Sequence, residues 1–281
     1  MAFLPRAFLE KQAALEACLG DPVTISGLAG SLGLFQRVRG HRHSIDDAVT
    51  AWYALRKAPS AERVLDLGAG AGTVGMIVLH GLSETAHVTC VEAQEASFQL
   101  LRANLECNGL EGRMVAMHGD LRDLRLATKF ELITGSPPYF EPGAGTLPRD
   151  AQKAHARFEL RGNVGDYAST ARRHLGEGGV FVYCFPYRQK QRGMDLVTRQ
   201  GFRLTSCRDI IPTRTCGPLF SVFAADLHSS GPMLQEEPLV VEGDDGRYSP
   251  EMLELQASRG FGPQGSNIVA PEHEDPYADG A

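Results

Sequence analysis

The chain has 281 residues, of which 43% are hydrophobic and 22% charged, which is the composition of an ordinary globular protein of one large domain or slightly more. No uncharged apolar run approaches the roughly 18 residues of a membrane span, and the N-terminus lacks the continuous apolar segment of a secretory signal. The composition therefore excludes a membrane protein, and we expect a cytoplasmic one.

The net charge of −6 is divided unevenly along the chain. Residues 236–281 hold eleven acidic residues and two arginines, a net charge of −9, which leaves +3 on the remaining residues. An acidic protein can still bind a polyanion where its basic residues are clustered, so a nucleic-acid partner is not excluded. The six cysteines form no Cys-x-x-Cys pair, and we expect reduced, buried thiols and no metal site.

The N-terminal part of the chain begins with an amphipathic pattern. Residues 5–19 place apolar side chains at helical spacing, whereas the Gly-rich residues 21–33 predict a loop. Three arginines and two histidines follow within residues 37–43, and Ser44 is suited to cap a helix. On the residues alone, this basic segment is most simply a solvated turn before the helix.

Strand and helix patterns alternate from there on. Strands are predicted at 64–67, 87–92, 113–118, 130–134, 180–185, 202–209 and 219–227. Helices are predicted at 73–82, 93–108, 149–175 with a break at Gly162, and 188–200. This alternation predicts an α/β fold, in which a mostly parallel sheet carries helices on both faces. No helical pattern separates the last two strands, so we expect them to form an antiparallel pair.

From about residue 229 the composition shifts to glycine, proline and acidic residues. We expect a short edge strand at 238–241, a helical turn or two at 249–258, and disorder beyond. We therefore divide the chain into an N-terminal helix and loop (1–33), an α/β domain (34–228), an extension packed on that domain (229–258) and a disordered acidic tail (259–281).

A glycine-rich loop follows the first strand of the alternating region. Its glycines allow a sharp turn and let a ligand approach bare backbone, and the helix that begins at Thr73 directs its free N–H groups over the loop. The loop glycines are Gly68, Gly70 and Gly72. This arrangement is typical of a nucleotide-cofactor site.

The choice of cofactor depends on the residues around this loop. Gly70 to Gly75 fits the dinucleotide pattern G-x-G-x-x-G, and Glu92 lies at the spacing that would favour NAD. Asp66, however, would repel a pyrophosphate and could bind an ammonium group. The later segment Gly-Ser-Pro-Pro-Tyr-Phe (135–140) also has no role in hydride transfer. Together these features resemble the class I S-adenosylmethionine-dependent methyltransferases, which implies that cofactor and a Rossmann-like, seven-stranded sheet.

Acidic side chains end three successive strands of the predicted sheet. Because the carboxyl ends of parallel strands meet at one edge, we expect Asp66, Glu92 and Asp120 to line one cofactor site. We expect Asp66 to border the amino-acid end of the cofactor and Glu92 to accept both ribose hydroxyls. Asp120 is expected to accept from the adenine amino group, with the N–H of Leu121 nearby.

The segment Ser136-Pro137-Pro138-Tyr139 follows the fourth strand and suits a methyl acceptor. An exocyclic amine is a poor nucleophile, because its lone pair is delocalised into the ring. The Ser136 hydroxyl and the Pro137 carbonyl can each accept one of its N–H groups and aim the lone pair at a methyl donor. The two prolines stiffen the loop, and Tyr139 with Phe140 is expected to stack an unstacked base.

A more specific resemblance covers roughly residues 34–258. Leu34-Phe-Gln-x-x-x-Gly40-x-Arg42-x-Ser44-Ile-Asp46, Asp66-Leu-Gly-Ala-Gly, Glu92, Gly119-Asp120 and Ser136-Pro-Pro-Tyr-Phe occur in an order similar to that of the bacterial tRNA adenine-N6 methyltransferases that modify valine tRNA. This resemblance implies adenine N6 in tRNA as the acceptor. It also implies that the segment before the first strand closes the cofactor pocket, which makes Asp46 or Asp47 a cofactor contact.

Basic residues near these motifs are the expected phosphate contacts. The candidates are Arg37, Arg39, Arg42, Arg157, Arg161, Arg188, Lys190 and Arg192. For each of them alone, a solvated surface position is an equally good interpretation.

One residue departs from the family pattern, and it leaves alternatives open. Most family members have asparagine where this chain has Ser136, and Ser-Pro-Pro-Tyr is similar to the motif of cytosine-N4 DNA methyltransferases. The alternatives are therefore a DNA or rRNA amino methyltransferase, a protein-glutamine methyltransferase of the release-factor type, or a cofactor-binding subunit without catalysis. The oligomeric state is open between monomer and homodimer.

Overall fold

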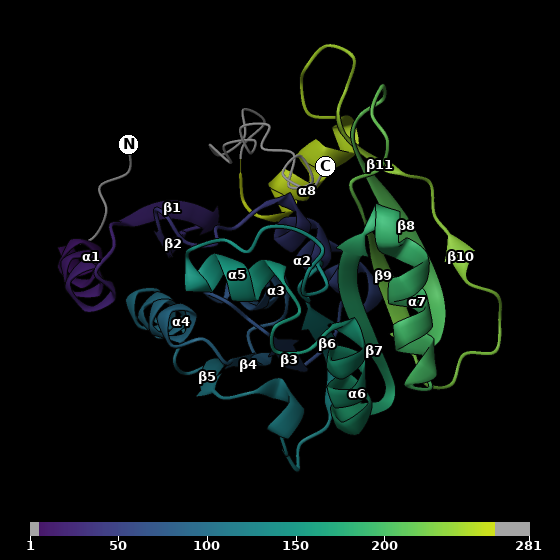
Figure 1. Cartoon of the computed structure of the whole chain (residues 1–281), viewed down its shortest axis with the longest axis horizontal. Coiled ribbons are helices and arrows are strands. Elements are labelled where there is room, and N and C mark those ends of the chain that lie inside the picture. Colours follow the sequence, from purple (N-terminus) through teal and green to yellow (C-terminus); the bar gives the residue numbers. More distant parts are fainter. Residues whose placement is uncertain (1–5, 262–281) are drawn as a thin grey trace.

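A nine-stranded mixed sheet forms the centre of the protein in the computed structural model, which describes residues 6–261 (Figure 1). The strand order is β10-β8-β9-β7-β6-β3-β4-β5, and β11 also pairs with β8. Of the paired strands, only β9 runs antiparallel to its neighbours, β7 and β8. The strands are β3 (Arg63–Leu67), β4 (His87–Glu92), β5 (Met114–His118), β6 (Phe130–Gly135), β7 (Leu175–Pro186), β8 (Arg203–Thr213), β9 (Phe220–Asp226), β10 (Leu234–Gln235) and β11 (Leu239–Glu242).

Helices cover both faces of this sheet, as the alternation predicted. One face packs on α2 (Ile45–Lys57), α3 (Thr73–Gly81) and α4 (Glu95–Cys107). The other packs on α6 (Val164–His174), α7 (Lys190–Arg199) and the 3-10 turn η1 (Leu121–Asp123). A second 3-10 turn, η2 (Tyr187–Gln189), leads into α7, and α5 (Ala151–Arg157) lies beyond the ends of the strands (Figure 1).

Alternating apolar side chains hold the three layers together. Along β3, Val64 joins the core on the α2 side, whereas Leu65 joins the core on the α6 side. Both are fully buried, as expected for parallel strands that are covered on both faces. The neighbouring strands repeat the division, with Leu132 facing one core and Ile133 the other. The sheet therefore presents only its edges and strand ends to other groups.

Helix starts follow the capping residues in the sequence. Ser44 forms a capping box with Asp47 at the start of α2, and Asn163 does the same with Asp166 at α6. Gly162, the predicted helix break, separates α5 from α6 with a φ of 107°. These caps fix the segments that precede α2 and α6 next to the strand ends.

The prediction of a loop at residues 21–33 is wrong, because these residues belong to a β-hairpin. The hairpin consists of β1 (Val23–Ala29) and β2 (Leu32–Arg37), so the proposed domain boundary at residue 33 divides a strand. Its Gly33 lies where a Cβ would stand 2.6 Å from the ring of Phe8, so the glycine allows α1 (Arg6–Leu19) to pack closely. The side chains of Asn104 and Asn108 on α4 bond the β2 backbone. A glycine needed for close packing was thus mistaken for a loop signal.

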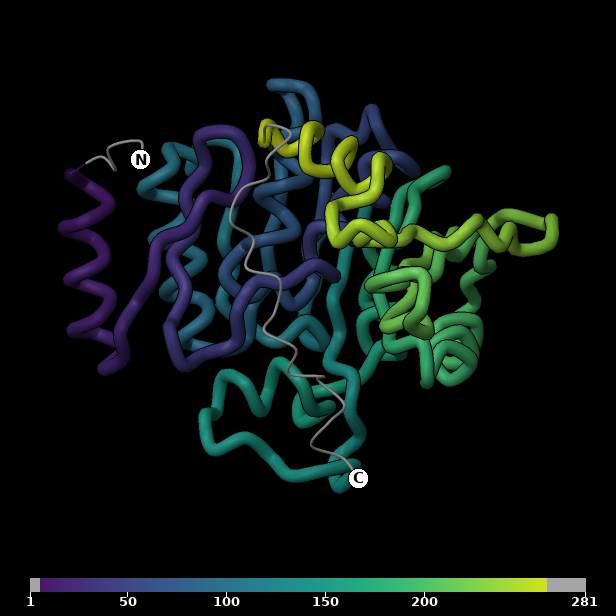
Figure 2. Tube along the Cα trace, turned by 90° about the horizontal axis from the view of Figure 1, so that it is seen from above, coloured from purple at the N-terminus to yellow at the C-terminus, as the bar shows by residue number. Residues whose placement is uncertain are grey.

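The C-terminal extension adds two strands to the seven of the predicted sheet: β11, which confirms the edge strand predicted at 238–241, and β10, which was not predicted. Both β10 and β11 pair in parallel with β8, and α8 (Pro250–Ser258) follows. The extension continues past residue 258, because the buried Arg259 donates from Nε to the carbonyl of Leu28 at 3.1 Å. Figure 2 shows this yellow end of the chain beside the purple hairpin. The boundary proposed at residue 259 therefore falls too early, while the disorder expected at 262–281 lies outside the described residues.

None of the helices in residues 6–261 is long and apolar enough to cross a membrane.

Candidate cofactor and acceptor site

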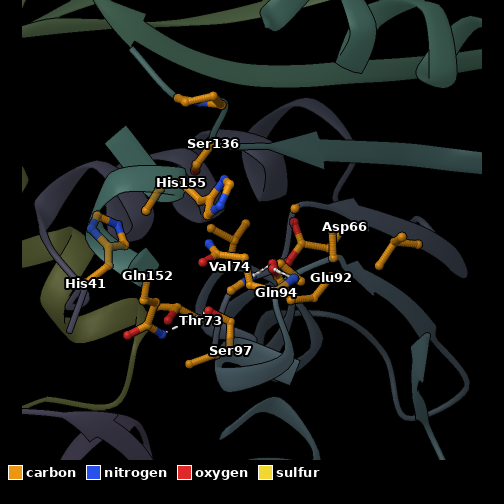
Figure 3. A pocket seen from close by; sticks show the side chains of 18 of the residues that line it. His41, Asp66, Thr73, Val74, Glu92, Gln94, Ser97, Ser136, Gln152 and His155 are labelled. Carbon is orange, nitrogen blue, oxygen red and sulfur yellow. Dashed lines mark hydrogen bonds between the residues drawn. The ribbon is translucent and has the colours of Figure 1, made fainter. Parts of the chain in front are cut away.

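A cavity lies at the carboxyl ends of β3, β4, β5 and β6, where the sequence predicted a ligand site (Figure 3). Its empty volume is about 1060 Å³, part of it open to solvent. The loops after these four strands line it together with residues 41–43, α5 and Tyr167 of α6. Seven of the predicted cofactor residues (Asp47, Asp66, Gly68, Gly70, Glu92, Asp120 and Leu121) lie in this lining, as do Ser136, Pro138 and Arg42.

The glycine-rich loop brings bare backbone to the cavity. Gly68 has a φ of 64°, and a Cβ at this position would stand 2.1 Å from the hydroxyl of Tyr167. Gly70 has a φ of 57° with open space around it, so its backbone faces the cavity without obstruction. Gly72 caps α3 but does not itself line the cavity. The expected close approach of a ligand to backbone is therefore possible at Gly68 and Gly70.

Asp66 is the most deeply buried carboxylate of the cavity, with 1% of its surface exposed. Its two oxygens accept from the N–H of Gly75 at 3.0 Å and from the hydroxyl of Thr134 at 2.8 Å. Burial raises the pKa of Asp66 to about 7, against these two hydrogen bonds, which lower it. Asp66 thus links β3, β6 and α3 and leaves a carboxylate at the cavity wall that a cation would stabilise in its charged form.

Glu92 ends β4 and is held by the backbone on both sides. One carboxylate oxygen accepts from the N–H of Gly70 at 2.8 Å and the other from the N–H of Gln94 at 2.7 Å. Each oxygen keeps a second lone pair for a ligand. Only 5% of Glu92 is exposed, and this burial raises its pKa, although the N–H donors oppose the rise. The glutamate therefore fixes the glycine loop while it faces the cavity.

Asp120 is less deeply buried and already has a cationic partner. Arg122 donates to both of its oxygens, at 2.9 and 2.6 Å, and lowers the pKa of Asp120. The carboxylate also accepts from the Arg122 backbone N–H and so caps η1. Asp120 and Leu121 are at the position predicted for an adenine-binding pair, with the Asp120 charge neutralised in advance.

The first turn of α2 contains Asp46 and Asp47, the two aspartates between which the sequence did not decide. Asp47 lines the cavity, where it accepts from the backbone of Ser44 and contacts Nδ1 of His43 at 3.2 Å. Burial opposes these hydrogen bonds, but the pKa of Asp47 is still lowered. Asp46 does not line the cavity and instead accepts from the hydroxyl of Tyr139 at 2.7 Å. Asp47, and not Asp46, is therefore placed for a cofactor contact.

The diproline loop reaches the cavity through Ser136 and Pro138. Ser136 directly follows β6, next to β3 in the sheet, so it faces the same cavity as the glycine loop. In Figure 3 its side chain and that of His155 on α5 project into the same part of the cavity, away from Glu92. A methyl acceptor held at Ser136 would thus meet a ligand held by the strand ends.

The expectation that Tyr139 stacks on a base is not met in this structure. Its ring packs edge-on against the ring of Phe185 in the core, with the ring centroids 6.1 Å apart. Its hydroxyl donates to Asp46. Phe140 also lies outside the cavity lining, against Phe158 at a centroid distance of 5.5 Å. Both rings face inward because the backbone of Tyr139 and Phe140 bonds the carbonyl of Arg157, which turns the loop toward α5. The two rings anchor the loop from outside the cavity.

The predicted phosphate-binding arginines differ in whether they are paired within the fold and whether they line the cavity. Arg37 is committed to the fold, because its 13% exposed side chain pairs with Asp21 at 3.0 Å and with Asp150 at 2.8 Å. Arg39 also pairs with Asp21, but its side chain is 72% exposed. Arg42 is exposed and lines the cavity. The guanidinium of Arg157 lies over the ring of Phe140, and neither Arg157 nor Arg188 lines the cavity.

Several residues that line the cavity were missed from the sequence. Gln152, His155 and Ala156 lie on one face of α5 and close the cavity opposite the strand ends. Their spacing of three and four residues is that of a helix face and is the signal that could have found them. Tyr167 of α6 packs against the glycine loop, and no local pattern marks it. The other lining residues that were missed include Gln36, His41, His43, Thr73, Gln94 and Ser97, whereas Arg161, a predicted phosphate contact, also lies in the lining.

The cavity is suited to a nucleoside that carries positive charge. Asp47, Asp66 and Glu92 present negative charge, which would attract an ammonium or sulfonium group in a site of low dielectric. The open space beside Gly70 and the N-terminus of α3 give room beside these carboxylates. Within residues 6–261, no group of three or more His, Cys, Asp or Glu is arranged to hold a metal ion.

Comparison with known proteins identifies related sequences and folds. Residues 42–163 match the model of the methyltransferase small domain. Among curated proteins, a tRNA1(Val) (adenine(37)-N6)-methyltransferase of Actinobacillus pleuropneumoniae is 23% identical, over 69% of this chain and 80% of the relative. The protein of that name from Tolumonas auensis is 26% identical, over 73% of this chain and 83% of the relative.

Solved structures share the fold. A predicted O-methyltransferase from Agrobacterium tumefaciens superposes with a TM-score of 0.58 at 19% identity and covers 76% of this chain and 97% of its own. A Listeria monocytogenes protein described as a class I S-adenosylmethionine-dependent methyltransferase gives a TM-score of 0.50 at 13% identity, with 70% and 68% covered. The chain therefore contains a match to the methyltransferase small domain at residues 42–163, has the fold of the class I S-adenosylmethionine-dependent methyltransferases, and resembles the curated tRNA adenine-N6 methyltransferases.

Proposed function

We propose that this enzyme methylates an exocyclic amino group of a nucleobase, and that the acceptor is adenine N6 in tRNA. The observation that carries the proposal is the position of Ser136 and the diproline loop at the same cavity as the carboxylates Asp66 and Glu92. The names of the curated relatives, which specify an adenine of a valine tRNA, support the choice of tRNA.

The half of the cavity formed by the strand ends would hold the cofactor. Asp66 and Asp47 would face its charged amino-acid end, Glu92 would accept from the ribose, and Asp120 with Leu121 would border the adenine. Gly68 and Gly70 leave room for it along the backbone. When bound, S-adenosylmethionine supplies an electrophilic methyl group on a sulfonium.

The acceptor amine is oriented by the diproline loop. Ser136 Oγ and the Pro137 carbonyl each accept one amine N–H, which turns the nitrogen lone pair toward the donor side of the cavity. The loop keeps this geometry because its residues are tied down on the far side: Gln189 donates to the Tyr139 carbonyl at 2.9 Å, and Tyr139 donates to Asp46. No general base is required, since methylation makes the remaining amine proton acidic.

Nucleic acid approaches from the open side of the cavity. Arg42 and His41 are exposed there, and the exposed Arg161 also belongs to the lining. Such side chains can neutralise phosphates without giving up an ion pair of the fold. Arg37, whose charge is already used by Asp21 and Asp150, is not part of this surface.

The test is methyl transfer to a panel of acceptors. The enzyme would be incubated with methyl-labelled S-adenosylmethionine and with tRNA, rRNA, DNA or a release factor, and the labelled nucleosides would be analysed. We expect N6-methyladenosine in tRNA. Label in rRNA or DNA alone would replace tRNA as the assigned acceptor. Label in the release factor alone would reject nucleobase methylation in favour of methylation of a protein amide.

A paired substitution tests the role of the acceptor loop. Ser136→Ala should lower turnover about tenfold, the effect of one lost hydrogen bond in an oriented complex, and should leave the affinity for S-adenosylhomocysteine unchanged in calorimetry. Ser83→Ala is the matched control, because Ser83 is exposed and remote from the cavity. An equal loss of cofactor affinity in Ser136→Ala would place Ser136 in the cofactor pocket instead.

A further inference from the structure

A chain of polar contacts runs from the start of α2 to the acceptor loop. Asp46 accepts from the Tyr139 hydroxyl at 2.7 Å, and that hydroxyl lies 3.3 Å from the Sγ of Cys184. The Cys184 thiol in turn donates to Ser136 Oγ at 3.6 Å. Of these four residues, only Ser136 lines the cavity. The other three therefore act on the site through Ser136.

The middle member of this chain, Cys184, is completely buried on β7. Burial, with the charge of Asp46 as a second cause, raises the pKa of the Cys184 thiol to about 12. The sulfur therefore keeps its proton near neutral pH and remains a hydrogen-bond donor. A thiol so buried and so weakly acidic is unsuited to redox or nucleophilic chemistry.

The available protons determine how the thiol is used. Tyr139 has one proton, and it is directed to Asp46; the pKa of Tyr139 is raised well above 10 by burial, so the proton stays in place. Toward Cys184, the tyrosine can then offer only oxygen lone pairs. The single thiol proton is thus donated to Ser136, while the Tyr139 oxygen lies against the sulfur at 3.3 Å, and the donated proton orients the serine.

A serine at this position needs such help more than an asparagine would. A hydroxyl on one carbon can rotate among three staggered positions, and only some of these direct a lone pair into the cavity. The thiol occupies one Oγ lone pair of Ser136 from the sheet side and leaves the other for an amine. Fixing the rotamer before the acceptor binds avoids an entropy cost during the reaction.

We propose that Cys184 is a positioning residue for Ser136 and holds its hydroxyl oxygen at the point where the acceptor amine must be received. This inference rests on the proposed function, in which Ser136 accepts an amine N–H. Cys184 does not touch the acceptor or the cofactor. The contribution of its thiol to turnover passes through the hydroxyl of Ser136.

The experiment is a double-mutant cycle on turnover with the tRNA acceptor. Cys184→Ala should lower kcat about three- to tenfold, the usual range for one hydrogen bond, and leave KM for S-adenosylmethionine unchanged. In the Ser136→Ala background, the same Cys184→Ala substitution should have no further effect on kcat. Equal losses in both backgrounds would overturn the proposal, because Cys184 would then act independently of the Ser136 hydroxyl.

Two further variants separate positioning from packing. Cys184→Ser restores a donor and should recover part of the kcat that Cys184→Ala loses. Cys207→Ala removes another fully buried thiol, on β8 and away from the cavity, and should lower thermal stability without lowering kcat. If Cys184→Ser is as slow as Cys184→Ala while both bind S-adenosylhomocysteine normally, the thiol acts only as a packing group and the inference is wrong.

The outcomes distinguish this inference from the proposed function. If the wild-type enzyme labels no nucleic acid, the proposed acceptor fails, and the cycle is run on whichever acceptor is labelled. If the wild type labels tRNA and the cycle is additive, only the role of Cys184 fails.

Discussion

The two halves of the cavity are built in opposite ways. In the cofactor half, Asp66 and Glu92 are almost completely buried, and each of their four carboxylate oxygens already accepts a hydrogen bond from the protein. In the acceptor half, Arg42 and His41 are exposed at the rim, and among residues 6–261 no ion pair is formed by either side chain. One half is rigid before any ligand binds, and the other can adapt.

This difference matches the ligands that we propose for each half. A small cofactor of fixed shape is bound best by groups that are already ordered, because little entropy is then lost on binding. A large polyanion is attracted by exposed cations at long range and needs few fixed contacts. Substitutions in the cofactor half should therefore affect stability and cofactor affinity together, whereas substitutions in the acceptor half should change RNA binding alone.

The largest effect is expected from Asp66→Ala. The substitution removes the acceptor of both the Gly75 N–H and the Thr134 hydroxyl in a fully buried place. We expect the free energy of unfolding to fall by about 2–4 kcal/mol and cofactor binding to become undetectable. Urea unfolding and calorimetry measure the two effects, with the exposed Asp123→Ala as control. Normal cofactor binding by Asp66→Ala would contradict the rigid-half interpretation.

Arg37→Ala should have the next largest effect, and on stability alone. Removing this arginine leaves Asp150 and one side of the buried Asp21 without their cationic partner, which should cost about 3 kcal/mol of unfolding free energy. Arg39→Ala, which removes an exposed partner of the same Asp21, should cost less than about 1 kcal/mol. Chemical denaturation compares the two variants. A raised KM for tRNA in a stably folded Arg37→Ala would return this arginine to the acceptor surface.

The two halves also differ in how far the sequence could predict them. The cofactor half follows from local patterns, because a strand, a glycine loop and an acid at each strand end are all visible within a few residues, and Asp66, Glu92, Asp120 and Ser136 do converge on one cavity. The partners of Arg37 could not be predicted this way, since Asp150 is 113 residues away in the chain and only the fold brings it close. The same holds for Tyr139 and Asp46, which are 93 residues apart.

Glycine in two roles explains the error in the N-terminal part. At Gly68 and Gly70 a positive φ is required, and the expectation of a tight loop is confirmed. Gly33 lies in a strand, and a glycine is needed there because the ring of Phe8 packs too closely to admit a side chain. A single sequence does not distinguish a glycine needed for its backbone from one needed for its size, and the β1–β2 hairpin was missed for that reason.

The pH dependence of cofactor binding also distinguishes the two halves of the cavity. Its expected size lies between the effect of Arg37→Ala and that of Arg42→Ala. In the folded protein the pKa of Asp66 is about 7, above the ordinary value of 3.8, so the folded state binds the proton more tightly than the unfolded chain does. The contribution of this proton to the free energy of unfolding is largest below about pH 4, and it is lost as the pH rises to 7. Binding of a cation has the opposite dependence, because it needs the ionised carboxylate.

We therefore expect the affinity for S-adenosylmethionine to rise up to about tenfold between pH 6 and pH 8, as measured by calorimetry. The uncharged analogue 5′-methylthioadenosine should show no such rise, since it has neither the sulfonium nor the ammonium group. Asp66→Asn should remove the pH dependence for S-adenosylmethionine. A slope that persists in Asp66→Asn would assign the titration to another group of the cavity.

The smallest effect, and the one most specific to the acceptor half, is expected from Arg42→Ala. This side chain forms no ion pair within the described residues, so its loss should leave stability and cofactor affinity unchanged. One lost phosphate contact should raise KM for tRNA about three- to fivefold at moderate salt and reduce the slope of log affinity against log salt by about 1.

The matched control for Arg42→Ala is Arg199→Ala, which removes an equally exposed arginine at the end of α7, away from the cavity. Both variants lose one positive charge, so long-range attraction of RNA falls equally in the two. Only a contact at the cavity rim makes Arg42→Ala the weaker binder. Equal salt slopes for the two variants would mean that the acceptor half attracts RNA only through net charge, and that the surface at the cavity rim does not bind a particular phosphate.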